Sequence, residues 1–140
     1  MIVCIYIICI YMEMALMVSK GLLTLKRVYE KPEAGDGTRI LVDRLWPRGI
    51  AKDKAGVDLW LKDIAPSDAL RKRFHGKPDD WDAFCAAYDS ELQGAAAQTA
   101  ARDLLDRLRK GPVTLLYAAR DERRNNAVAL KAWLERRRGG

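Results

Sequence analysis

The groups best suited to chemistry are concentrated in one short stretch, residues 43–49. It contains two guanidinium groups, a carboxylate, an indole, a proline and a glycine within seven residues. The stretch follows residues 39–42, a short run with the β-branched and aliphatic composition of a strand. Proline and glycine favour a loop over a continuation of that strand. We therefore expect a polar loop at the carboxyl end of a strand.

Two further segments place polar residues after predicted strands. Residues 64–67 end the alternating segment 57–64, and residues 119–121 follow the apolar run 113–118. In an open α/β sheet, ligands bind outside the carboxyl ends of the strands, where loops diverge and helix N-termini point their N–H groups into the crevice. If the strands are parallel, all three polar loops meet at one edge of the sheet.

These loops carry groups that bind anions. Arg44 and Arg48 offer planar forks that match carboxylate and phosphate, and Trp46 offers a flat surface for stacking. Ser67, as the predicted cap of a helix, adds the partial positive charge of a helix N-terminus. Lys62 and Arg71 are within reach of the same edge. We expect a small anionic ligand at this site, whether or not the protein is an enzyme.

An internal salt-bridge network is the alternative for the same bases. Asp43, Asp63 and Asp121 could neutralise the bases and pin the loops without any ligand, and the two arrangements can coexist. Trp46 could equally be a hydrophobic plug over the strand ends. A third possibility is that the loop of Trp46 and Pro47 docks another protein.

A catalytic role would depend on three candidate residues. Asp43 or Asp121 is the candidate general base, because a carboxylate near a low-dielectric strand end can have its pKa raised toward working pH. Tyr117 is the third group against which an anionic ligand would be positioned. No GxGxxG, P-loop or GxSxG motif occurs, which disfavours a conventional dinucleotide or P-loop enzyme. His75, the single histidine, precedes a glycine at a predicted helix end, where a surface or capping role is expected.

Basic residues exceed acidic ones and give the 140-residue chain a formal net charge of +6. Such an excess favours anionic partners, whether a nucleotide, a phosphate ester, an acidic metabolite or nucleic acid. Nucleic-acid binding or a regulatory interaction is therefore the alternative function, although no known DNA-reading or RNA-binding signature is present. It would depend on basic side chains outside the polar loops: Lys20, Lys26, Arg27, Arg107, Arg109, Lys110 and Arg136, Arg137 and Arg138.

The three cysteines predict neither a disulfide framework nor a metal centre. Cys4, Cys9 and Cys85 form no CxxC pair and have no spacing with His75 that indicates zinc. We therefore expect no metal site, and the sequence indicates no particular cofactor. Cys85 falls on the apolar side of a predicted helix and is expected to be a small core residue in a reducing compartment.

The N-terminal segment differs from the rest of the chain. Residues 2–12 are almost wholly apolar but too few to cross a bilayer, which needs about 20. No Lys or Arg precedes Lys20, so the positive n-region of a secretory signal is missing. We expect residues 1–20 to be an apolar extension, from a mis-assigned start or a disordered segment. One domain over residues 21–136 and a frayed tail over 137–140 complete the expected organisation.

Strand-like and helix-like segments then follow in mixed succession. Strands are expected at 22–29, 39–42, 57–64 (or a short helix there) and 113–118, and helices at 52–55, 67–76, 78–92, 95–110 and 122–136. The link between the first two strands is too short for a crossover helix, so these strands are either antiparallel or not adjacent. The pattern indicates an α/β fold, a small three-layer sandwich with a mostly parallel four-stranded sheet and about four main helices.

Three longer motifs carry a resemblance to a known family. They are DGTRILVDRLWPRG at residues 36–49, DLWLKDIAPS at residues 58–67, and LLYAARD followed by NNA within residues 115–127. In this order they resemble the YeaO-like branch of the bacterial domain of unknown function 488 family, over residues 25–134. The resemblance implies a compact cytoplasmic α/β domain, and it brings no established activity. Cofactor and oligomeric state stay open.

The resemblance marks the same three segments as the family's signature. Family members often have His or Gln where Arg124 stands, so no role built on a histidine at that position applies to this chain. Arg39 and Asn125 join the candidate ligand-binding residues through the resemblance. The residues that match the family's motifs are Arg39, Asp43, Arg44, Trp46, Pro47, Arg48, Gly49, Trp60, Lys62, Pro66, Ser67, Tyr117, Asp121 and Asn125.

Overall fold

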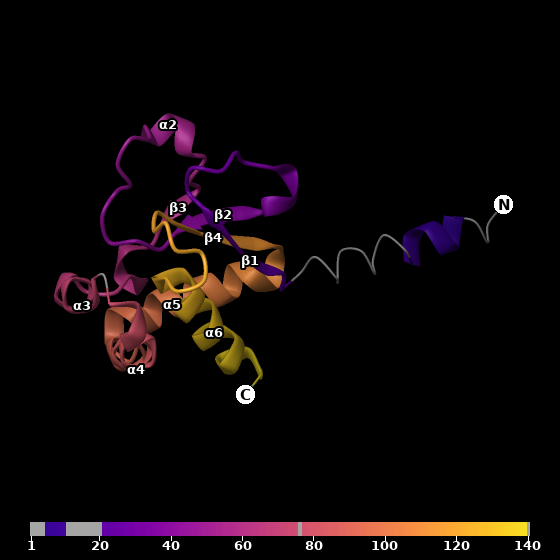
Figure 1. Cartoon of the computed structure of the whole chain (residues 1–140). Coiled ribbons are helices and arrows are strands. Elements are labelled where there is room, and N and C mark those ends of the chain that lie inside the picture. The colour runs from indigo at the N-terminus through magenta and orange to yellow at the C-terminus, as the bar shows by residue number, and fades with distance from the viewer. Residues whose placement is uncertain (1–4, 11–20, 76, 140) are drawn as a thin grey trace.

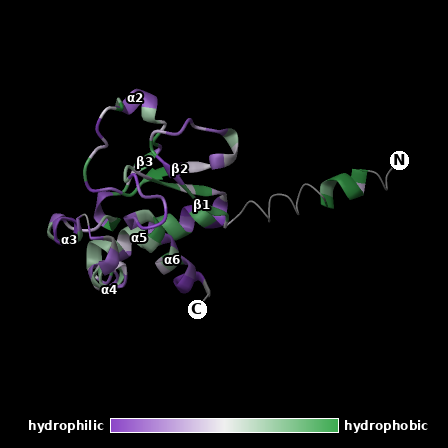
Figure 2. Ribbon diagram, viewed as in Figure 1, coloured by the Kyte–Doolittle hydropathy of each residue, from purple (hydrophilic) through white to green (hydrophobic). Residues whose placement is uncertain are grey.

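The computed structural model describes residues 5–10, 21–75 and 77–139. Residues 5–10 form a short helical stretch that is mostly hydrophobic (Figure 2). Its isoleucine and tyrosine side chains are exposed. Most of the expected apolar extension, residues 1–20, lies outside the described residues. Within the described ranges, no helix is both long enough and apolar enough to span a membrane.

A four-stranded parallel sheet in the order β1-β4-β2-β3 forms the centre of the domain (Figure 1). Its strands are β1 (Leu23–Arg27), β2 (Thr38–Leu41), β3 (Leu59–Trp60) and β4 (Val113–Tyr117). The α/β fold with a four-stranded sheet is confirmed, and the sheet is parallel throughout. Because β4 lies between β1 and β2, the second of the two alternatives for these strands is correct: they are not adjacent.

The central position of β4 follows from its side chains. All five of its residues are buried, as the almost continuous apolar run predicts for a strand covered on both faces. Its one polar residue, Thr114, is satisfied inside the protein. The Thr114 hydroxyl donates a hydrogen bond of 2.7 Å to the carbonyl of Asp36 and lies 2.9 Å from the hydroxyl of Thr24.

All the predicted helices are present, but the last one begins at Asn126 instead of 122 and continues to Gly139, into the tail expected at 137–140. They are α2 (Lys52–Ala55), α3 (Asp68–Phe74), α4 (Trp81–Glu91), α5 (Ala95–Lys110) and α6 (Asn126–Gly139), with 3-10 turns at Ala34–Asp36, Lys62–Ile64 and Pro78–Asp80. Capping explains why the boundaries were predictable. Ser67 accepts a hydrogen bond of 3.1 Å from the N–H of Leu70 at the start of α3. Gly94 and Gly111 flank α5 at the two ends that the sequence predicted.

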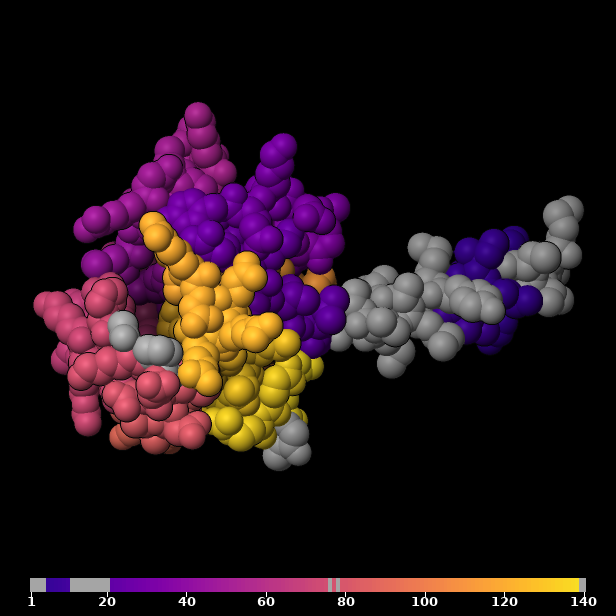
Figure 3. All heavy atoms as spheres, viewed as in Figure 1, coloured from indigo at the N-terminus to yellow at the C-terminus, as the bar shows by residue number. Residues whose placement is uncertain are grey.

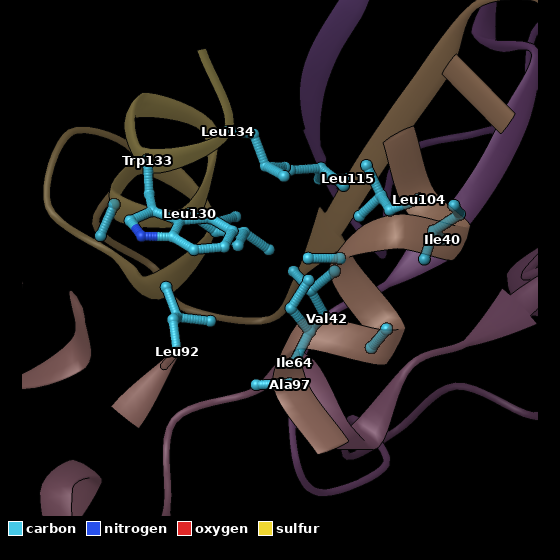
Figure 4. Close-up of a cluster of buried hydrophobic side chains, with 14 of the residues drawn as sticks. Ile40, Val42, Ile64, Leu92, Ala97, Leu104, Leu115, Leu130, Trp133 and Leu134 are labelled. Carbon is cyan, nitrogen blue, oxygen red and sulfur yellow. The ribbon is translucent and has the colours of Figure 1, made fainter. Parts of the chain in front are cut away.

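The main hydrophobic core lies between one face of the sheet and helices α3 to α6 (Figures 1 and 4). Ile40 and Leu115 from the strands join Leu104 of α5 and Leu130 and Trp133 of α6 in one buried cluster. Each fully buried aliphatic side chain of this size contributes about 1.5–3 kcal/mol of transfer free energy. The helical face therefore holds the largest share of the apolar burial.

The opposite face of the sheet is covered by a thinner layer of loops and α2 (Figure 1). Its fully buried members are Val28, Leu41, Ala55 and Leu116. Half-buried apolar residues pack against these four: Trp46, Ile50, Val57, Trp60 and Ala118. Because the first polar loop contributes Trp46 to this second core, packing fixes the position of that loop.

The expected strand over residues 57–64 is much shorter in the structure. Only Leu59 and Trp60 pair with β2, and the chain then enters the 3-10 turn Lys62–Ile64. Within residues 57–64, the prediction of a strand is therefore correct only for Leu59 and Trp60. Leu59 packs against the helical core, whereas Val57 and Trp60 pack against the second core, so Val57 does not share the face of Leu59 as the alternation predicted.

Candidate anion-binding site

Parallel pairing brings the carboxyl ends of the strands to one edge of the sheet. Tyr117 at the end of β4 pairs with Arg27 at the end of β1, and Leu116 pairs with Leu41 at the end of β2. The polar loops that follow these strands therefore meet at that edge. In Figure 3 the loop after β4 stands between the region of α3 and the region of β1 and β2.

A cavity of about 730 Å³ lies among these loops. Its charged groups are strongly unbalanced, because the lining contains a single carboxylate, that of Asp43. Five arginines line the same cavity: Arg27, Arg44, Arg48, Arg71 and Arg120. Tyr29, Trp46, His75 and Asn126 add aromatic and neutral polar surface. The cavity is thus strongly cationic.

Asp43 connects four elements around this cavity. Its Oδ2 accepts a hydrogen bond of 2.9 Å from the N–H of Ala118, after β4. Its Oδ1 accepts one of 3.0 Å from Nδ2 of Asn126, at the start of α6. Its backbone carbonyl accepts a third, of 2.7 Å, from Nε1 of Trp60 in β3. The side chain of Asp43 therefore holds the loops together.

Burial raises the pKa of the Asp43 carboxyl above its ordinary value. The hydrogen bonds from Asn126 and Ala118 and the positive charge of Arg71 act in the opposite direction without outweighing burial. This direction is the one expected of a general base. Both carboxylate oxygens, however, already accept hydrogen bonds from the protein, as a structural anchor requires.

The two arginines of the first polar loop form no ion pair in the described part of the chain. Arg44 donates from Nε to the carbonyl of Pro66, at 3.3 Å, and from Nη2 to the carbonyl of Ala65, at 3.2 Å. Arg48 is exposed, and its carbonyl accepts a hydrogen bond of 2.8 Å from the hydroxyl of Tyr29. Carbonyl groups satisfy hydrogen bonds but do not neutralise a guanidinium, so both positive charges remain available.

Three more arginines reach the cavity from other elements. Arg27 donates two hydrogen bonds of 3.0 Å to carbonyl groups of the loop after β4. Arg71, on α3, pairs at 2.8 Å with Asp68, which lies outside the cavity lining. Arg120 is exposed in the loop after β4. These three arginines come from the end of β1, from α3 and from the loop after β4.

Trp46 packs as a plug over the strand ends and also lines the cavity. Its Nε1 donates a hydrogen bond of 2.7 Å to the carbonyl of Ile50, and its ring meets that of Trp60 edge to face, with centroids 5.4 Å apart. Lys62 does not line the cavity, because its Nζ lies 4.0 Å from the centre of the Trp60 ring in a cation–π contact.

The helix N-terminus at Ser67 already holds an anion. The carboxylate of Glu91 accepts hydrogen bonds from the N–H of Ser67, at 2.8 Å, and from its hydroxyl, at 2.5 Å. This internal carboxylate stands where the sequence led us to expect a ligand. Pro66 lines the cavity, and Ser67 does not.

The third polar segment organises the start of α6. Oδ1 of Asp121 accepts hydrogen bonds from the N–H groups of Arg123, at 2.9 Å, and Arg124, at 3.1 Å, and these bonds lower the pKa of Asp121. Asn125 caps α6, because its Oδ1 accepts a bond of 2.9 Å from the N–H of Val128. A lowered pKa makes Asp121 a weaker general base than the sequence indicated.

Two other candidate residues are buried away from the cavity. Tyr117 is only 4% exposed, and burial raises the pKa of its phenol. Arg39 is only 3% exposed, and its Nη1 lies 2.6 Å from Oδ2 of Asp36. The other N–H groups of Arg39 donate to backbone carbonyls. The structure therefore gives Arg39 a buried ion pair and does not bring it to the cavity.

Sequence reasoning missed several residues that line the cavity: Arg27, Tyr29, His75, Arg120 and Asn126. Arg27 could have been found, because it lies at the carboxyl end of a strand, and the same rule selected the other loops. His75 lies beyond the end of α3, and only the packing of that helix brings it near. In the described part of the chain, no group of three or more His, Cys, Asp or Glu side chains is arranged to hold a metal ion.

Fold and site together define a small parallel α/β domain with an arginine-lined cavity at the carboxyl ends of its strands. The chain belongs to the family described as the "Inactive DUF488-N3 subclade", whose sequence model matches residues 22–138. This match confirms the resemblance that the three motifs carry.

Two similar proteins are themselves uncharacterised. The protein YeaO of Escherichia coli K12 is 48% identical over 109 residues, which is 78% of this chain and 93% of that protein. The protein Rv3073c of Mycobacterium tuberculosis H37Rv is 41% identical over 121 residues, which is 86% of this chain and 100% of that protein. No solved structure matches this chain.

Proposed function

We propose that this protein binds a small anion, a carboxylate or a phosphate ester, in the arginine-lined cavity and acts as a binding protein. The observation that carries the proposal is the charge of the lining: five arginines line one cavity whose lining contains a single carboxylate. Arginine forks match the geometry of carboxylate and phosphate and stay charged at any working pH. A dianionic group would offset part of the mutual repulsion among these bases.

The role of Asp43 supports binding over catalysis. Both of its carboxylate oxygens accept hydrogen bonds that tie the strand ends to α6, so a change of protonation would disturb the site itself. The raised pKa of Asp43 is compatible with a general base, but burial alone accounts for it. The description of the family as an inactive subclade points the same way.

Nucleic-acid binding has less support from the same charges. Most of the basic side chains on which it depends are paired with carboxylates: Lys26 with Asp36, Arg107 with Asp103, Arg109 with Asp106, Arg136 with Asp89 and Arg138 with Glu135. Such pairs reduce the local positive potential that a phosphate backbone needs. In the described part of the chain, four arginines without an ion pair lie around one concave cavity, which suits a small ligand better than a duplex: Arg27, Arg44, Arg48 and Arg120.

Isothermal titration calorimetry with inorganic phosphate and a series of phosphate esters and carboxylates, in a low-chloride buffer, tests the proposal. We expect saturable one-site binding that weakens about tenfold or more in Arg48→Ala, the loss of one charge-assisted hydrogen bond. Arg109→Ala is the matched control, because it also removes one exposed arginine but lies outside the cavity. No binding of any anion, or equal losses in the two variants, would overturn the proposal.

The same two variants separate the alternative function. If nucleic acid were the ligand, a labelled duplex or single strand would bind with an affinity that falls steeply with salt. Loss of that binding in Arg109→Ala, with phosphate inactive as a competitor, would replace the small-anion site by a nucleic-acid surface. We expect no such salt-dependent shift.

A further inference from the structure

A second cavity, of about 360 Å³, adjoins the arginine-lined cavity. The two share Pro66, Arg71, Ala119 and Asn126 in their linings, so they meet along the line between α3 and the loop after β4. We call this second cavity the aromatic pocket, because three aromatic side chains line it: Phe74, Trp81 and Phe84.

The rings of the aromatic pocket form an apolar aromatic surface. Trp81 and Phe84 stack nearly parallel, with centroids 5.7 Å apart and an interplanar angle of 18°. Phe74 meets Phe84 edge to face at 5.8 Å. All three side chains are half buried, so each packs against the helical core and keeps surface toward the pocket. Such a surface suits a planar ring better than a flexible chain.

The charged groups at the pocket continue the cationic character of its neighbour. Lys77, Arg71 and Arg124 line it together with one carboxylate, that of Asp121. Arg71 lines both cavities, so an anionic group beside it lies at the junction. A ligand that places its anion among the arginines would therefore extend any attached group past Arg71 and Asn126 toward the three rings.

We propose that the ligand of the arginine-lined cavity is an aromatic anion, an aryl or heteroaryl phosphate or carboxylate, whose ring lies in the aromatic pocket. The inference rests on the proposed function and narrows it to a chemical class. Charge complementarity indicates that one end of the ligand is anionic, and the adjoining aromatic surface indicates that the other end is an aromatic ring. A bare inorganic anion would leave the aromatic pocket to water.

A calorimetric comparison of inorganic phosphate, n-butyl phosphate and phenyl phosphate on the full chain tests this class. We expect phenyl phosphate to bind about tenfold or more tightly than inorganic phosphate, and n-butyl phosphate to lie between them, because stacking adds to the anion contacts. In Trp81→Leu the advantage of phenyl phosphate is lost while the affinity for inorganic phosphate is unchanged. Arg48→Ala weakens the binding of both.

A measurement on the unaltered protein guards against a Trp81→Leu variant that does not fold. Intermolecular nuclear Overhauser effects from the phenyl protons to the Trp81 indole are expected in the complex. Equal affinities for phosphate and phenyl phosphate, or phenyl contacts only to residues outside the aromatic pocket, overturn the aromatic class and leave the anion site intact. Absence of binding by both ligands removes the anion site, and the aromatic class with it. Binding of phenol as tight as that of phenyl phosphate also overturns the inference, because the ring would then bind independently of the arginines.

Discussion

The side-chain amide of Asn126 donates a hydrogen bond of 3.0 Å to Oδ1 of Asp43, which joins the first residue of α6 to the loop after β2. The N–H of Ala118 donates to the other oxygen of the same carboxylate. Two donors therefore converge on one side chain, and only a carboxylate can accept from both with its two oxygens. This relationship sets the relative position of the loops that line the cavity.

Replacement of Asp43 by asparagine is expected to destabilise the protein. The new amide keeps one acceptor but turns its NH₂ toward Asn126 or Ala118, so one donor loses its partner. Leaving a buried donor unsatisfied costs about 1–3 kcal/mol, which urea unfolding can measure. Asp63→Asn is the control, because Asp63 is exposed. This substitution is expected to change the free energy of unfolding by less than about 0.5 kcal/mol. If Asp43→Asn and Asp63→Asn unfold at the same urea concentration, the result would contradict the anchoring role of the Asp43 side chain.

The Asp36 carboxylate predicts a loss of stability in acid. Burial by itself would raise the pKa of Asp36, but hydrogen bonds from Lys26, from the N–H of Glu33 and from Arg39 lower it from 3.8 to about 2. Because the folded pKa lies below the unfolded value, this group stabilises the fold above pH 3.8, and that contribution is lost as the pH falls through about 2. The full contribution is at most about 2.5 kcal/mol, at 1.36 kcal/mol per pKa unit.

Urea unfolding between pH 5 and pH 2 checks this prediction with Asp36→Asn. The difference in the free energy of unfolding between the native chain and Asp36→Asn is expected to shrink steadily toward pH 2. Asp43 has a raised pKa, so its titration has the opposite sign and favours the fold as the pH falls. A difference that stays constant over this range would show that Asp36 is not the group responsible.

Buried and exposed tyrosine hydroxyls are expected to differ in their importance. The hydroxyl of Tyr88 is fully buried and donates a hydrogen bond of 2.5 Å to the carbonyl of Ile64. Tyr88→Phe leaves that carbonyl unpaired and is expected to cost about 1–3 kcal/mol. Tyr29→Phe, which removes an exposed hydroxyl, is expected to cost less than about 0.5 kcal/mol. Equal costs for the two variants, by thermal or urea unfolding, would contradict this assignment.

Substitution of Ser67 tests whether this residue is a structural cap or a contact to the ligand. Ser67→Ala removes the cap of α3 and the hydrogen bond from the Ser67 hydroxyl to Glu91, with an expected loss of about 1 kcal/mol of stability. Its affinity for phosphate is expected to equal that of the native chain, because Ser67 does not line the cavity. A loss of phosphate affinity as large as that of Arg48→Ala would return Ser67 to the binding site.

Local patterns in the sequence predicted the parts of the fold that depend on local physics. The capping residues Ser67 and Gly111 mark helix ends, and the apolar run of β4 marks a strand buried on both faces. The length of β3 was not predictable, because the turn after Trp60 depends on packing against the helical core and not on alternation. Strand order also required the structure, although chain length already limited how β1 and β2 could be arranged.

The candidate site was predictable in position but only partly in membership. Asp43, Arg44 and Arg48, which the strand-end rule selected, line the cavity. Arg39 was included because it lies in the same motif, yet the pleat of β2 turns it into a buried ion pair with Asp36. Composition cannot distinguish an arginine that is available to bind a ligand from one that forms an ion pair with a neighbouring carboxylate.

A ¹H–¹⁵N correlation spectrum of the native chain titrated with inorganic phosphate tests the central claim most directly. If the arginine-lined cavity binds the anion, the backbone amides that shift will be confined to the end of β1, the loops after β2 and β4, the region of α3 and the start of α6. Those amides will follow one saturation curve and will not respond to an equal increase in ionic strength. An unchanged spectrum, or shifts centred on the basic residues at the end of α5, would contradict the account.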